Sequence, residues 1–109
     1  MKKILLFVLV LIVGCTKEPE PINIATLNAR KDGYYAINTN EPYTGAVFEL
    51  YESGEKSEEG YLKDGKEDGK WISYSENGKI RTETNKKDGL RVKIIYYNED
   101  GSIESVKEW

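Results

Sequence analysis

The sequence predicts an all-β fold, an elongated antiparallel meander of repeated hairpins, and the first observation behind this is a glycine repeat. Glycines recur at a constant interval of about two dozen positions, and a fixed period of this size is typical of repeat architectures. The pairs that define this repeat interval are Gly45 and Gly69, Gly54 and Gly78, and Gly65 and Gly89. A helix is disfavoured over the same stretch, because each glycine in a helix interior costs about 1 kcal/mol.

Turn dipeptides between alternating runs are the second observation, and they predict hairpins. The expected strand pairs are 47–51 with 56–62, 70–75 with 79–85, and 92–97 with 102–107, joined at Ser53-Gly54, Asn77-Gly78 and Asp100-Gly101. Further turns are expected at Asp64-Gly65 and Asp68-Gly69, and an earlier strand at 34–37. We expect both residues of Asn77-Gly78 to adopt positive φ.

Side-chain alternation is the third observation, because successive residues of a strand point to opposite faces of a sheet. One face is expected to carry Phe48, Leu50, Ile72, Tyr74, Ile95 and Tyr97, and the other Val47, Trp71 and Ile94. Neither face is fully polar, and the repeat region contains no helical segment to cover one. We therefore expect stacked aromatic residues to replace a conventional core.

The segment 1–14 reads as a cleaved secretory signal peptide. Lys2 and Lys3 precede a run of apolar residues, 4–13. A helix of that length reaches about 15 Å, against about 30 Å of bilayer hydrocarbon, so the alternative of a membrane-spanning anchor is disfavoured.

Cys15 is the predicted lipidation site. The junction Ile12-Val13-Gly14-Cys15 resembles a bacterial lipobox, which implies diacylation of the Cys15 sulfur after cleavage. The alternative, a disulfide or core cysteine, is disfavoured because the chain has no second cysteine. Two or three acyl chains, at about 0.8 kcal/mol per buried CH₂, would hold the protein at the membrane. Thr16 stands where an aspartate would resemble an inner-membrane retention signal, which favours the outer membrane of a Gram-negative envelope.

Three regions follow from these patterns: a signal peptide at 1–14, the lipidated cysteine and a flexible tether at 15–31, and a repeat domain at 32–109. The tether contains the polar, proline-rich stretch 16–21. The stretch Ile22–Arg30 fits either a short strand or one helical turn, and we expect low order there.

Composition narrows the chemistry. Loss of Lys2 and Lys3 takes the net charge from −3 to −5, which argues against nucleic acid as a partner. With no histidine and no motif for nucleophilic or phosphoryl-transfer chemistry, we expect no catalytic residue, no cofactor and no metal site. The remaining carboxylates are interpreted as solvated turn charges rather than a glycosidase pair or a calcium loop: Glu58, Glu59, Asp64, Glu67 and Asp68.

A family resemblance covers about two-thirds of the chain, from Pro42 to Trp109. The pattern Tyr61-x3-Gly65-x3-Gly69-x-Trp71, followed by Tyr74-x2-Asn77-Gly78-Lys79, resembles the variant form of the MORN repeat. This resemblance implies a sheet shaped by glycines and aromatics, acting as a binding or scaffold module. Bacterial lipoprotein members are frequently labelled antitoxin-like, which implies an immunity-type partner by analogy at the level of the fold.

Exposed tyrosine and tryptophan are frequent interface anchors, because each has an apolar body and a polar tip. The candidate partner-binding residues are Tyr51, Trp71, Tyr74, Tyr96 and Tyr97. The alternative is that they form the core, which is favoured for Trp71 and Tyr74 at repeat-defining positions. We expect a non-catalytic, lipid-anchored envelope protein that binds another protein, with a carbohydrate- or peptidoglycan-binding module as the second hypothesis.

Overall fold

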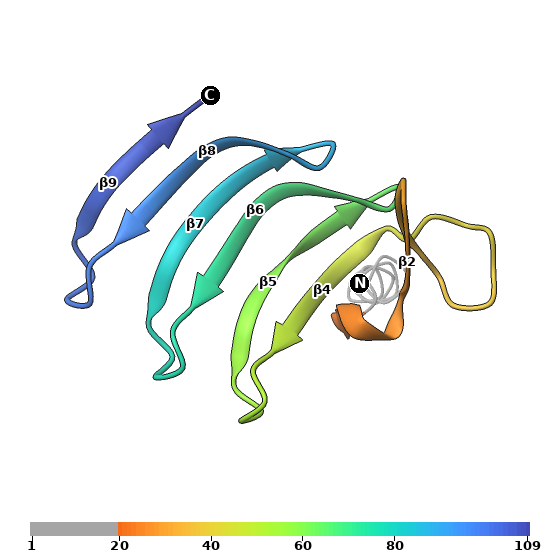
Figure 1. Ribbon diagram of the computed structural model, residues 1–109, viewed down its shortest axis with the longest axis horizontal. Helices are drawn as coiled ribbons and strands as arrows, with labels where there is room; N and C mark the ends of the chain where they lie inside the picture. The colour runs from red at the N-terminus through yellow and green to blue at the C-terminus, as the bar shows by residue number, and fades with distance from the viewer. Residues whose placement is uncertain (1–19) are drawn as a thin grey trace, which may run out of the picture.

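A computed structural model describes residues 20–109, most of which belong to one sheet built of sequential hairpins (Figure 1). Its long strands are β4 (Gly45–Leu50), β5 (Lys56–Lys63), β6 (Lys66–Tyr74), β7 (Ile80–Lys87), β8 (Leu90–Tyr97) and β9 (Ile103–Glu108). Each of these strands pairs antiparallel with the next one in the chain. The predicted all-β meander is therefore confirmed. Cys15 and the predicted signal peptide lie outside the described residues.

The segment before the meander is folded against its first strand. Strand β1 (Ile22–Asn23) pairs parallel with β4, and a 3-10 turn, η1 (Ile24–Thr26), follows it. Strands β2 (Asn28–Arg30) and β3 (Gly33–Tyr35) then form a small antiparallel hairpin. The expected low order of Ile22–Arg30 is thus corrected, because its apolar side chains pack on the core of the sheet. Within residues 20–109, no helix is long and apolar enough to cross a bilayer.

The turns at one end of the sheet are two-residue hairpin loops. Asp64 and Gly65 have φ of 49° and 83°, and Asp88 and Gly89 have φ of 50° and 86°. Two consecutive positive φ values are typical of the type I′ turn, whose twist matches that of the flanking strands. The Asp64-Gly65 turn is thus confirmed.

The turns at the other end place only their glycine at positive φ. Gly78 has φ of 88°, as predicted, whereas Asn77 is not at positive φ, so the expectation is confirmed for Gly78 and wrong for Asn77. The Gly78 N–H donates to the Ser75 carbonyl at 2.9 Å, and the Asn77 side chain accepts from the Lys79 N–H at 3.1 Å. Asp68-Gly69 is not a turn: both residues lie inside β6, where Asp68 pairs with Tyr61 and Gly69 lies at the register shift between β5 and β6.

The sequence repeat is visible in hydrogen bonds between units. The Gly65 N–H donates to the Tyr43 carbonyl at 2.8 Å, and the Gly89 N–H donates to the Glu67 carbonyl at 2.9 Å. Both partners of the second bond follow those of the first by the repeat interval that separates the paired glycines. The segment around Tyr43 therefore takes the place of a preceding unit and caps the sheet beside β4.

One face of the sheet carries the core, and we call it the core face. Val47, Leu62 and Trp71 are almost fully buried there, beneath Ile22, Ile24, Leu27, Tyr34 and Tyr43. The Trp71 indole lies directly over Gly60 on the neighbouring strand, in space that any side chain at residue 60 would fill. A conventional core thus exists, and the expectation that stacked aromatics replace it is corrected. Part of its cover, Ile22, Ile24 and Leu27, comes from the segment expected to be a tether.

Candidate binding face

The opposite side of the sheet, which we call the open face, carries a continuous row of side chains. Residues directly paired across six strands form this row: Phe48, Glu59, Ile72, Glu83, Ile95 and Val106. None of these residues is buried. Directly paired residues share a face, so apolar and acidic side chains alternate across the sheet. The segregation of Phe48, Ile72 and Ile95 from the core face was predicted correctly.

The open face carries a tyrosine–carboxylate–lysine cluster formed by Tyr74, Glu59 and Lys56, and we call these three residues the first unit. The Tyr74 hydroxyl donates to Glu59 Oε2 at 2.5 Å, and Lys56 Nζ lies 2.7 Å from Glu59 Oε1. The ammonium of Lys56 and the Tyr74 hydroxyl hold the pKa of Glu59 below its usual range. Burial, together with the ionised Glu59 carboxylate, raises the pKa of Tyr74 to about 12. The cluster is therefore a carboxylate and a neutral phenol at neutral pH.

The second unit repeats this cluster incompletely. Glu83 and Ile80 follow Glu59 and Lys56 at the repeat interval, and Tyr97 follows Tyr74 at an interval shorter by a single position. Burial, followed by the nearby Glu83 carboxylate, raises the pKa of Tyr97. Ile80 stands at the position of the lysine, so the second unit has the carboxylate and the phenol but no internal ammonium.

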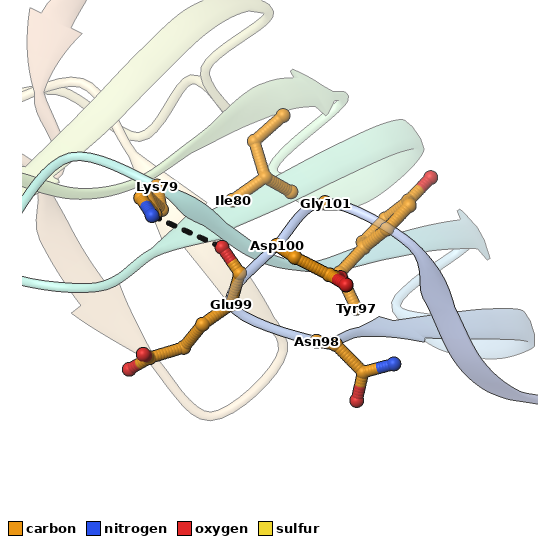
Figure 2. A pocket seen from close by; sticks show the side chains of 7 residues that line it. All are labelled: Lys79, Ile80, Tyr97, Asn98, Glu99, Asp100 and Gly101. Atoms are coloured by element: carbon orange, nitrogen blue, oxygen red, sulfur yellow. Dashed lines mark hydrogen bonds between the residues drawn. The ribbon is translucent and has the colours of Figure 1, made fainter.

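A hollow of about 420 Å³ lies beside Ile80 and Tyr97 at the turn between β8 and β9 (Figure 2). Its polar wall consists of Asn98, Glu99 and Asp100, and Lys79 Nζ donates across it to the Glu99 carbonyl at 3.1 Å. A second hollow of about 280 Å³ involves open-face residues, among them Phe48, Lys56, Glu59 and Ile72. Open-face residues therefore line part of both hollows.

The structure separates the predicted aromatic candidates into three places. Tyr74 and Tyr97 lie on the open face. Tyr51, half-buried directly after the end of β4, donates a hydrogen bond from its hydroxyl to the Tyr74 carbonyl at 2.5 Å. Tyr96 pairs with Thr82 and Ser105 and therefore projects from the core face, where it is 36% exposed.

Trp71 belongs to the core and not to a contact surface. It is 3% exposed, its Nε1–H donates to the Tyr61 carbonyl at 3.2 Å, and Lys86 Nζ lies 5.1 Å from its ring centroid. A partner could reach its ring only after this packing was broken. The core alternative therefore holds for Trp71.

The carboxylates considered from sequence do not form one site. Glu59 lies on the open face, whereas Glu58 lies on the core face, opposite Glu49 across β4 and β5. Burial raises the pKa of Glu58, with further contributions from the charges of Glu67 and Glu49. Among residues 20–109, no three acidic, histidine or cysteine side chains are grouped so that they could hold a metal ion.

The sequence reasoning missed the part that Lys56, Glu59 and Glu83 take in the open face. The signal was present, because Glu59 and Glu83 are separated by the same repeat interval as the glycines. Comparison of the chain with family models, curated proteins and solved structures found no match.

Proposed function

We propose that this chain is a lipid-anchored, non-catalytic protein of the bacterial cell envelope that binds another protein through its open face. The observation that carries the proposal is the uncovered row on that face, in which apolar side chains alternate with Glu59 and Glu83. Leu50, Ile80 and Val106 are each at least 39% exposed there. Exposed apolar surface bordered by polar groups is characteristic of interaction sites.

The resemblance to variant MORN repeats supports the same function, because it implies a scaffold or binding module. The recurrence of the Gly65 and Gly89 backbone bonds in successive units and the glycine-centred turns agree with that resemblance. An immunity-type partner, a toxin, is the form of this function that the antitoxin-like label of the family suggests. Separation of Glu58 and Glu59 onto opposite faces supports a non-catalytic role, because they cannot converge on one substrate bond.

A carbohydrate- or peptidoglycan-binding module is the second candidate. The observation that favours it is the hollow with the Tyr97 ring on its wall and polar groups at its rim. Sugars stack on aromatic rings and bond to such groups.

A crosslinked pull-down from envelope extract separates the two candidates. The bait is the full chain, compared with a Leu50→Glu/Val106→Glu variant of the open face. The matched control is Leu90→Glu/Val92→Glu, which places the same charges at other exposed positions. We expect one protein that the open-face variant loses and the control retains. Loss of capture on addition of cell-wall sugars would favour the second candidate.

The lipid anchor is tested separately. Replacement of Cys15 with serine removes the only thiol of the chain and should abolish labelling with radioactive fatty acid. Persistent labelling of the Cys15→Ser protein would contradict the anchor.

A further inference from the structure

We propose that the hollow over Ile80 and Tyr97 is a cation subsite that receives a lysine or arginine side chain of the partner protein, paired with Glu83. This inference rests on the proposed function and names the chemistry of one contact within it. Two repeat units of the open face share their backbone pairing but differ in one side chain, Lys56 in the first and Ile80 in the second.

The first unit shows what a complete cluster contains. Lys56 pairs with Leu50 across the strands, and its side chain runs along β5 to Glu59, three residues away. Its ammonium lies 2.7 Å from Glu59 Oε1, while the Tyr74 hydroxyl takes the other carboxylate oxygen. Both oxygens of the Glu59 carboxylate thus have a partner within the chain.

The second unit has the same framework. Ile80 pairs with Tyr74 as Lys56 pairs with Leu50, and Glu83 lies three residues after Ile80 as Glu59 lies after Lys56. The strand register shifts at Tyr74 as it shifts at Leu50, so the backbones correspond. A lysine at residue 80 would therefore run toward Glu83.

Isoleucine is shorter than lysine and carries no charge. Ile80 therefore occupies less space than a lysine would, and it cannot form an ion pair with Glu83. A hollow of about 420 Å³ lies beside Ile80 and Tyr97; Glu83 does not line it but follows Ile80 by three residues on the same strand. Among the described residues, Glu83 forms no ion pair. At the rim, the Glu99 carbonyl accepts from Lys79 Nζ, and the Asp100 carboxylate accepts from the N–H and the hydroxyl of Ser102 in its own turn.

These features select a cation with an apolar stem. The alkyl chain of lysine or arginine would lie on Ile80, its charged end would reach Glu83, and the Tyr97 ring would add a cation–π contact. A neutral sugar would use the ring and rim but would leave Glu83 without its charged partner. The missing ammonium of the second unit is thus supplied by the other protein.

The test is an NMR titration of the full chain in detergent micelles with n-butylammonium chloride, and with 1-butanol as the neutral probe. We expect saturable shifts of Tyr97 ring signals with butylammonium and a response at least about threefold weaker with butanol. Glu83→Gln should weaken butylammonium binding by a similar factor. Ile80→Lys should also weaken it, because the new lysine occupies the site from within the chain.

A gain of function provides the matched control. Lys56→Ile should create a second butylammonium site, reported by Tyr74 signals, because it converts the first unit into a copy of the second. Equal binding of both probes, or a butylammonium response unchanged by Glu83→Gln, would overturn the cation subsite. Saturable binding of a neutral disaccharide that ignores Glu83→Gln would also overturn it.

The same variants distinguish failure of this inference from failure of the proposed function. If the pull-down partner is lost in the open-face variant but bound equally by Glu83→Gln, the open face binds a protein and the cation subsite is wrong. If the open-face variant retains its partners, the proposed function itself fails.

Discussion

The Tyr74 hydroxyl donates a hydrogen bond to Glu59 Oε2 at 2.5 Å, across two neighbouring strands of the open face. The two residues are 15 positions apart in the chain, and the β5–β6 hairpin brings them together. This bond fixes an aromatic ring and a carboxylate on a surface that has no cover. The open face is therefore ordered before any partner binds, which lowers the entropic cost of association.

Removal of that hydroxyl should cost stability. We expect Tyr74→Phe to lower the free energy of unfolding by about 1 kcal/mol, because a hydrogen bond to a charged group at a partly exposed site is lost. Urea unfolding measures the difference. The control is Tyr35→Phe, because the Tyr35 hydroxyl donates to Asp32 outside the meander. This variant should lose less unfolding free energy. Equal losses for both variants would contradict the role given to the Glu59 bond.

The cost of Tyr74→Phe should depend on pH. The folded pKa of Glu59 is lowered, so the stability it contributes is present above its unfolded pKa and is lost as pH falls through the folded value. The folded pKa of Tyr74 is raised to about 12, so its contribution is lost as pH rises from about 10 toward 12. The free energy of unfolding of the parent should be constant around neutral pH and should fall at both the acid and the alkaline end of this range. A difference between Tyr74→Phe and the parent that is constant from pH 3 to pH 11 would be inconsistent with this cluster.

Glu58 should show the opposite sign. Its pKa is raised by burial and by Glu67 and Glu49, against the lowering effect of Lys86. The folded state therefore binds this proton more tightly, and the resulting stability is lost as pH rises through the folded pKa. We expect Glu58→Gln to stabilise the protein by about 0.5 kcal/mol at pH 7 and to lose this advantage below about pH 4. Thermal melts at the two pH values test this, with the exposed Glu55→Gln as the control that should change little.

Gly60 should be sensitive to the smallest substitution. A methyl group at residue 60 would enter the volume of the Trp71 indole, so Gly60→Ala should destabilise the domain by about 1–3 kcal/mol. A smaller ring should relieve the overlap, so Trp71→Phe combined with Gly60→Ala should cost less than the two separate effects added together. Additive losses in denaturant unfolding would show that residues 60 and 71 do not share this space.

Substitutions at Gly78 measure the cost of backbone strain without a contribution from packing. Its φ is 88°, and a Cβ there would meet no atom within 4 Å, so only conformation opposes substitution. We expect Gly78→Val to cost about 1–3 kcal/mol, because β-branched residues resist this conformation. Gly78→Asn should cost much less, since asparagine tolerates it. Identical melting temperatures for Gly78→Val and the parent would contradict the turn geometry.

Much of the meander could be predicted from the sequence, because the cues are local. Alternation and glycine-centred turns placed the strands and sorted Phe48 and Trp71 onto opposite faces correctly. The burial of Trp71 under the N-terminal segment could not be predicted from such local cues. It depends on the absence of a side chain at Gly60, which becomes its neighbour only once the strands are registered.

The packing of the N-terminal segment on the core could not be predicted either, for a related reason. The apolar positions Ile22, Ile24 and Leu27 are too few to define a period, so their structure is imposed by contact with the core. The open-face cluster depends on the pairing of Lys56, Glu59 and Tyr74 from two strands. Such cross-strand geometry follows from register shifts and not from composition.

Site-specific photo-crosslinking in intact cells tests the central claim, that the open face binds a partner protein. A photoreactive amino acid is placed at Leu50, Ile80 or Val106 on the open face, and at Leu90 or Val92 for comparison; all are exposed. We expect one crosslinked protein, of the same mass from each open-face position, and none from the two comparison positions. Crosslinks of equal yield from both sets, or from Leu90 and Val92 alone, would contradict it.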